Sequence, residues 1–262
     1  MRDPEIPEYL GKAALPGVGK KLSQDRTRAL TSQAPIVQKA NRGELFALFD
    51  GMGSKGQAGA DAAEVMCEMV TDFFRKTDEF EASSAGLHQL LLQGNRIIND
   101  WGTDLQTGKC RGGCVGSVLW VFDDEAYVIH AGDTAVYCVA DRKALGLTSR
   151  HCDEQGLITS FFGAGTGLQV DIHKLPLAQC EFLVLVSDGV TDRCSPEDIA
   201  DIVSGQQETG QAAMGLVRLA IMAWNRWSPS RVLAGHFAWN VQRVLLNGRM
   251  RVFTFPDSFC RV

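Results

Sequence analysis

The stretch that decides the fold is LFALFDGMGSKG, residues 45–56. Five apolar residues end abruptly in Asp50, and glycines at positions 51, 53 and 56 follow before a helical pattern begins. A run of this kind predicts a strand buried on both faces, with Asp50 at the rim of the core, where its carboxylate can bind a cation. The glycines permit a tight turn and a close approach to a ligand. Aspartate and glycine are also ordinary turn residues, so a plain strand–turn–helix corner explains this stretch equally well.

The composition of the chain is that of an ordinary globular protein. Its 262 residues, 45% hydrophobic and 22% charged, fit one large domain or two small ones with a sizeable core. A net charge of −5 does not point to a polyanionic partner. Residues 1–10 carry acids and two prolines where a signal peptide would be apolar, and no apolar run approaches the ~18 residues of a membrane-spanning helix. We therefore expect a cytoplasmic protein without a membrane segment.

The eight cysteines contain no CxxC pair. They are spread through expected helices and strands, which favours reduced thiols in the cytosol over a disulfide framework or a zinc site. Cys110 and Cys114 are the only close pair, and without a neighbouring histidine they are not expected to bind metal.

Residue spacing predicts blocks of strands and blocks of helices. Residues 1–16 hold three prolines and no periodicity, so a lead-in is expected there. His130, on one of the strands, is expected to be a satisfied sheet residue. The expected helices cover residues 57–74, 87–101, 195–203 and 211–224, the third with an N-cap at Ser195 and Pro at its first position. The expected strands cover residues 45–49, 182–186, an edge strand at 34–38, an antiparallel meander of 115–122, 126–130 and 136–140, and a hairpin of 241–246 and 250–255 around Asn247-Gly248. A polar loop is expected over residues 141–167. Because strands and helices do not alternate singly, we expect an α+β fold instead of a doubly wound parallel sheet.

Aspartates beside glycines recur at three strand ends. They are Asp50, Asp133 and Asp188, and Asp25 lies near a fourth. Oxygen ligands of this kind suit Mg²⁺ or Mn²⁺. Two such ions close together share a carboxylate and lower the pKa of a bridging water. A phosphate ester is the natural substrate of such a centre.

These segments resemble the metal-dependent protein phosphatases of the 2C type, the PPM family, in its bacterial DGMG form. The resemblance covers about residues 17–224 in the family's order and spacing. It rests on FDGMG at 49–53, GCVGS at 113–117, AGDTAVY at 131–137, LTSRH at 147–151, LVLVSDGVTD at 183–192 and SQD at 23–25.

The resemblance implies a four-layer αββα sandwich of two antiparallel sheets flanked by helix pairs. It also implies two Mn²⁺ or Mg²⁺ ions. Asp50 would bridge them, the Gly51 carbonyl would bind one, and Asp188 would bind the other. The implied activity is hydrolysis of phosphoserine and phosphothreonine by metal-activated water, on a phosphoprotein that a Ser/Thr kinase has modified.

Further roles follow from the same resemblance. Asp133, helped by Asp192, would line a weaker third metal site, and Asp25 would hold a metal-bound water. Lys20 stands where the family usually has an arginine for the substrate phosphate. A lysine supplies the charge without the bidentate grip of an arginine.

The chain departs from the family pattern near its end. Trp239 stands where the family's last metal-binding aspartate belongs, and the segment between His151 and Phe161 is short for the family. Residues 224–262 carry six arginines, three tryptophans and a single acid, Asp257. This tail fits a basic partner surface, a divergent closing strand pair, or a segment whose reading frame departs from the ancestral one.

Three functions remain open on the sequence. The first is a Mn²⁺/Mg²⁺-dependent protein phosphatase, with a domain over residues 17–256, a divergent basic end from 224 and a tail at 257–262. The second is a pseudophosphatase, a non-catalytic binding or regulatory protein on the same fold. The third is nucleic-acid binding through the Arg/Trp tail, which the acidic body of the chain argues against.

Overall fold

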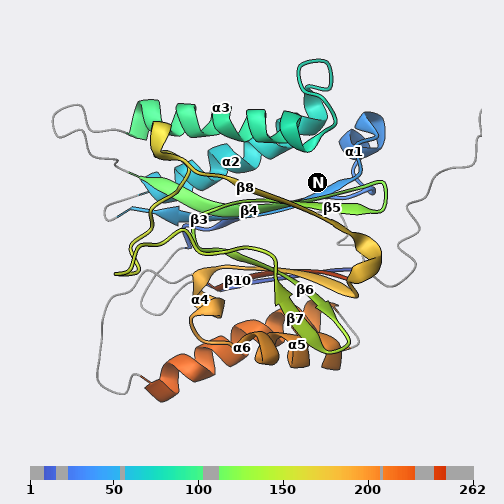
Figure 1. Ribbon diagram of the computed structural model, residues 1–262, viewed down its shortest axis with the longest axis vertical. Coiled ribbons are helices and arrows are strands. Elements are labelled where there is room, and N and C mark those ends of the chain that lie inside the picture. The colour runs from blue at the N-terminus through green and yellow to red at the C-terminus, as the bar shows by residue number, and fades with distance from the viewer. Residues whose placement is uncertain are drawn as a thin grey trace, which may run out of the picture.

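The computed structural model describes residues 9–15, 23–53, 57–102, 112–206, 209–227 and 239–245. They form two stacked antiparallel sheets with helices on both outer faces (Figure 1). The predicted αββα sandwich is confirmed. Among the described residues, no helix combines the length and the apolar character needed to cross a membrane.

The first sheet carries the stretch that decides the fold. Its strand order is β2 (Arg26–Leu30), β3 (Glu44–Met52), β4 (Gly113–Phe122), β5 (Glu125–Ala131) and β8 (Asp171–Pro176). The second sheet has the order β1 (Leu10–Leu15), β10 (Trp239–Leu245), β9 (Phe182–Val186), β6 (Ala135–Ala140) and β7 (Lys143–Gly146). Both central apolar runs, at 45–49 and 182–186, are strands as predicted.

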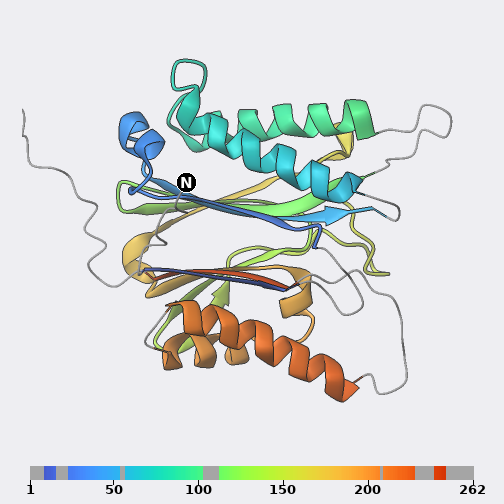
Figure 2. The same ribbon diagram turned by 180° about the vertical axis from the view of Figure 1, so that it is seen from behind.

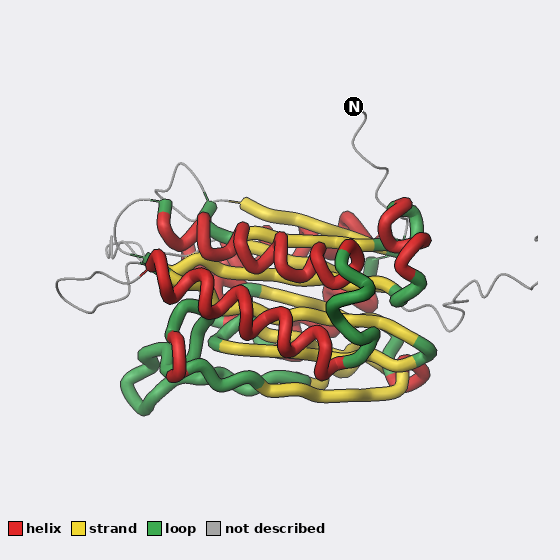
Figure 3. The backbone as a smooth tube through the Cα atoms, turned by 90° about the horizontal axis from the view of Figure 1, so that it is seen from above, coloured by secondary structure: helices red, strands yellow, loops and turns green. Residues whose placement is uncertain are grey.

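Helix pairs cover the outer faces. Helices α2 (Ala58–Arg75) and α3 (Ser84–Gly102) lie side by side over the first sheet, as Figure 3 shows from above. Helices α5 (Pro196–Gly205) and α6 (Thr209–Trp227) cover the second sheet on the opposite side of the molecule (Figure 2). Ser195 caps α5 with a reciprocal capping box, as expected. Shorter helices are α1 (Pro35–Ala40) and α4 (Asp188–Thr191), with 3₁₀ turns at Gly165–Gly167 and Leu177–Gln179.

The core alternates along each central strand. In β3, Leu45, Ala47 and Phe49 pack under α2 and α3, whereas Phe46 and Leu48 face the second sheet. In β9, residues 183 and 185 fill the same space between the sheets, and residues 184 and 186 pack on α5 and α6. All five side chains of the 45–49 run are fully buried, so the strand is covered on both faces as predicted.

Several predictions about local structure are wrong. Residues 35–40 form α1 instead of an edge strand, because Pro35 occupies the first helical turn, where its fixed φ is favourable. Residues 10–15, within the predicted lead-in, form β1, which pairs with β10 far along the chain. The meander is limited to β4 and β5, since the chain crosses to the other sheet at Gly132 (φ +106°) and β6 pairs with β9. The loop 141–167 contains β7.

The cysteines also differ from expectation. Cys138 of β6 and Cys180, just before β9, form a disulfide. The prediction that the cysteines are reduced thiols is therefore wrong for this pair. The two lie 42 residues apart in sequence, and only the pairing of β6 with β9 brings them together. The other cysteines among the described residues are free: Cys67, Cys114, Cys152 and Cys194.

Candidate metal centre

Strand register places Asp25 opposite Asp50 in the first sheet. Arg26 pairs with Phe49 in the antiparallel β2–β3 ladder, and one further step along each strand brings the two aspartates together. Both are buried, with 6% and 9% of their surface exposed. Burial raises the pKa of Asp50 well above its usual range, and the charge of Asp25 raises it further.

The same arrangement recurs in the second sheet. Ala135 pairs with Val186 at the end of the β6–β9 ladder, and Asp133 and Asp188 each lie two residues beyond this pair, close enough for their charges to interact. Burial, together with the negative charges of Asp133 and Asp192, raises the pKa of Asp188 to about 8. One carboxylate oxygen of Asp188, Oδ1, is buried and has no hydrogen-bond partner in the part of the chain that the structure describes.

The two pairs form one carboxylate cluster, consisting of Asp25, Asp50, Asp133 and Asp188. The charges of Asp188 and Asp133 raise the pKa of Asp50, and that of Asp25 raises the pKa of Asp188. The charged groups that raise the pKa of Asp50 and of Asp188 are therefore all carboxylates. The structure brings together four of the residues that the sequence predicts as a metal site.

Gly51 allows the cluster to sit tightly against α2. A Cβ atom on Gly51 would lie 2.4 Å from the carbonyl oxygen of Gly59 and 2.7 Å from that of Gln24. Neither backbone can retreat easily, because one belongs to the first turn of α2 and the other leads into β2. A side chain at position 51 would force these elements away from Asp50.

The cluster fits hard divalent cations. Repelling carboxylates and a buried, unpartnered oxygen are what a cation would relieve. Among the described residues, no three His, Cys, Asp or Glu side chains converge as a ready-made metal site.

Asp192 approaches the cluster through α4. Its backbone N–H donates to the Asp188 carbonyl at 2.8 Å, so one helical turn separates the two side chains. The carboxylate of Asp192 is held by Arg150 at 2.9 Å, and the same guanidinium lies 3.4 Å from Asp133. The two residues predicted to share a weaker third ion thus share an arginine, which the sequence did not single out.

A directional hydrogen-bond chain fixes the backbone before Asp133. The Nε2 atom of buried His130 lies 3.1 Å from the carbonyl oxygens of Gly132 and Ser149, which only accept, so Nε2 carries the proton. Its Nδ1 atom therefore accepts from the Ser117 hydroxyl at 2.9 Å, and Ser117 accepts from Thr134 at 2.7 Å. His130 is a satisfied sheet residue, as predicted.

His151 holds the same glycine from the other side. The Gly132 N–H donates to His151 Nδ1 at 3.2 Å, and the His151 N–H donates to the Gly132 carbonyl at 2.7 Å. His151 Nε2 then donates to Asp171 at 3.0 Å. A Cβ on Gly132 would lie 2.1 Å from the Val115 side chain, so only glycine fits. The sequence shows this histidine within LTSRH but does not reveal the contact.

Position 239 also lies at the centre. Val241 pairs with Val186 at the end of the β10–β9 ladder, residue 239 begins β10 two residues beyond this pair, and β10 packs against α4, whose first residue is Asp188. The departure from the family pattern therefore lies close to the cluster. Lys20, the predicted phosphate-binding residue, lies outside the described residues, as does the second hairpin strand at 250–255.

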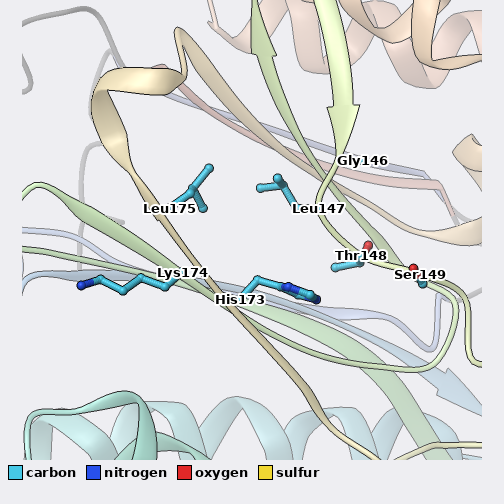
Figure 4. A pocket seen from close by; sticks show the side chains of 7 residues that line it. All are labelled: Gly146, Leu147, Thr148, Ser149, His173, Lys174 and Leu175. Atoms are coloured by element: carbon cyan, nitrogen blue, oxygen red, sulfur yellow. The ribbon is translucent and has the colours of Figure 1, made fainter.

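A groove of about 320 Å³ opens between the edges of the two sheets near Arg150. Figure 4 shows Leu147 and Leu175 pointing into it from opposite sides, with His173 directed toward Thr148 and Ser149. Lys174 points away from these residues and pairs with Glu125 at 3.3 Å. The groove thus has an apolar end and a polar end, and its polar end adjoins the segment that carries Arg150.

Comparison with known proteins places this geometry in context. Residues 20–214 match the family model described as protein phosphatase 2C. The chain is 26% identical over 225 residues to protein phosphatase PhpP of Streptococcus pneumoniae, covering 76% of this chain and 88% of that protein. It is 46% identical over 182 residues to the probable protein phosphatase 2C 34 of Arabidopsis thaliana, covering 61% and 50%.

Solved structures share the fold at low sequence identity. The serine/threonine phosphatase Stp1 of Staphylococcus aureus superposes with a TM-score of 0.75 at 16% identity, covering 93% of this chain and 96% of that one. The catalytic domain of the phosphatase PstP, solved in complex with two manganese ions, gives 0.68 at 18% identity, covering 89% and 96%.

The histidine chain predicts a pH dependence of stability. Burial, together with the charge of His151, lowers the pKa of His130 from 6.5 to about 4. Between these values the unfolded chain binds a proton that the folded chain does not. The contribution of His130 to the free energy of unfolding should therefore fall by about 3 kcal/mol as the pH drops from 6.5 to 4.

Urea unfolding of the wild type and of His130→Gln, each measured across this pH range, checks the prediction. The difference between the two proteins isolates His130 from the carboxylates, whose raised pKa values act in the opposite direction. The same pH slope in both proteins would contradict the assignment.

Proposed function

The chain belongs to the protein phosphatase 2C family and is a metal-dependent protein serine/threonine phosphatase, and we propose that the carboxylate cluster holds its Mn²⁺ or Mg²⁺ ions. The match to the family model covers most of the chain. The relatives are named as phosphatases, which favours an enzyme over the pseudophosphatase alternative. The site assignment rests on the two ladders whose ends bring Asp25 near Asp50 and Asp133 near Asp188, where their charges interact.

Three members of the cluster have distinct parts in this proposal. Asp50, which the charges of both sheets reach, would bridge the two ions, and the carbonyl of the buried Gly51 beside it would bind one of them. Asp188 would bind the second ion through its buried Oδ1, which has no hydrogen-bond partner among the described residues. Asp25 lies against Asp50 and orients it. Bound Mn²⁺ or Mg²⁺ supplies Lewis acidity toward phosphate oxygens and lowers the pKa of water.

The substrates are phosphoproteins, and we propose that they are products of a Ser/Thr kinase. Lys20 is proposed to hold the substrate phosphate, on the sequence alone. The Arg/Trp-rich tail at 224–262 remains a proposed partner surface, and β10 supports a closing strand within it. A cytoplasmic location is likewise a proposal, and the Cys138–Cys180 disulfide removes the support that reduced thiols would lend it.

Removing one carboxylate of the cluster should lower activity but raise the stability of the metal-free protein. We expect Asp50→Asn and Asp188→Asn to lower Mn²⁺-dependent hydrolysis of p-nitrophenyl phosphate about 100-fold or more, since the metal supplies several kcal/mol of transition-state stabilisation. Without metal, both variants should be more stable than the wild type by about 1 kcal/mol, because each removes a buried repulsion. Enzyme assays and metal-free thermal unfolding measure the two effects.

Asp201→Asn is the matched control, because Asp201 is exposed and pairs with Arg142 away from the cluster. It should change neither quantity. Undiminished hydrolysis in Asp50→Asn and Asp188→Asn would exclude the cluster as the metal site.

Placing an acid at position 239 should strengthen binding of the second ion. Because β10 begins at this position and packs against α4, whose first residue is Asp188, Trp239→Asp adds a negative charge near the place where the second ion would bind. We expect Mn²⁺ affinity to rise about tenfold, since ligand charge tunes such sites. Isothermal titration calorimetry measures it, with Trp239→Asn as the uncharged control. Equal affinities in the two variants would show that position 239 does not reach the ion.

The role proposed for Lys20 can be distinguished from that of the neighbouring Lys21 by substitution. Loss of a charge that binds the substrate phosphate should raise KM in Lys20→Ala about tenfold with a smaller change in kcat. Lys21→Ala is the control for general loss of positive charge. Steady-state kinetics on a phosphopeptide decides, and equal effects of the two substitutions would refute a specific role for Lys20.

A further inference from the structure

Arg150 connects two carboxylates at the rim of the cluster. Its Nη1 donates to Asp192 Oδ1 at 2.9 Å, and its Nη2 donates to Asp133 Oδ2 at 3.4 Å. Asp133 is almost completely buried, whereas 48% of the Arg150 side chain is exposed. The guanidinium therefore closes the site from the solvent side, with one nitrogen directed at each acid.

The backbone on both sides of Arg150 is tethered. The carbonyl of Ser149 accepts from His130, and the N–H of His151 donates to the Gly132 carbonyl at 2.7 Å. Both tethers end on the segment that leads directly into Asp133. The position of Arg150 relative to Asp133 is thus set by the fold, and little conformational entropy remains to be lost when the ion pair forms.

The charge at this place is permanent. A guanidinium does not lose its proton in proteins, and it already pairs with the two carboxylates that a third divalent ion would need. A divalent ion placed between them would lie a few ångströms from this positive charge. At that distance, electrostatic repulsion opposes binding of the ion even at a partly exposed site. Asp133 and Asp192 therefore do not fit a third metal ion while Arg150 lies between them.

We propose that Arg150 takes the place of a third divalent cation, so that this phosphatase binds two ions and gains a third site only when Arg150 is removed. The inference rests on the proposed function, because it takes the carboxylate cluster as the site of the first two ions. It adds that the positive charge between Asp133 and Asp192 comes from a side chain of the protein itself. The enzyme should therefore need no more than two bound ions.

Counting bound ions tests the proposal without recourse to activity. Mn²⁺ binding is followed by calorimetry and by the electron paramagnetic resonance signal of free Mn²⁺. We expect two sites in the wild type and three in Arg150→Ala. Arg150→Gln, which keeps much of the side-chain size, should also show three, and it decides the question if Arg150→Ala does not fold. The double variant Arg150→Gln/Asp192→Asn should return to two.

Arg142→Ala is the matched control, since Arg142 is another surface arginine in an ion pair, with Asp201 at 2.9 Å. It should keep two sites. Three sites in the wild type, or two in both Arg150 variants, would overturn the role of Arg150 and leave the proposed function standing. Fewer than two sites in the wild type would refute the carboxylate cluster as a two-ion centre, and the inference with it.

Discussion

Repulsion between buried carboxylates is the constraint on which the rest of this structure depends. Asp50 and Asp188 lie at neighbouring strand ends of two different sheets, and burial together with like charges raises the pKa of both. Because the pKa of Asp188 in the folded protein is raised to about 8, burying this carboxyl group has a free-energy cost at neutral pH relative to the unfolded chain. This cost grows as the pH rises from the unfolded pKa toward 8. A cation that binds only the folded state reverses it, so metal binding and folding are coupled.

The sandwich is built to tolerate that cost. Strands β3 and β9 are buried on both faces and alternate their side chains between the space shared by the sheets and the helix pairs outside. Such strands cannot slip by one residue without exposing half of the core, so their register is strongly determined. Register in turn fixes which acids stand opposite one another. The hydrophobic core thus supplies the rigidity that holds like charges together, and the histidine chain around Gly132 does the same for Asp133.

The sequence predicts this centre well where the signal is local. The runs at 45–49 and 182–186 and the acids that end them can be read directly, and helical spacing locates α2, α3, α5 and α6. The features that the sequence does not predict depend on contacts between distant segments. No local pattern at residues 10–15 indicates that they pair with β10. The turn at Gly132 places β6 in the other sheet, and this also brings Cys138 next to Cys180. Arg150 escapes for the same reason, since its two partners are 17 and 42 residues away.

Two features at the end of the second sheet act in the same direction. Position 239 carries no acid, and Arg150 places a positive charge between Asp133 and Asp192. Both reduce the negative charge at the end of the second sheet, whereas the pair Asp25–Asp50 in the first sheet is unaffected. A divalent ion therefore meets the stronger field beside Asp50, and the ion beside Asp188 depends on fewer charges. On the proposed assignment, the two sites should consequently fill in sequence, with the first sheet's site occupied before the second.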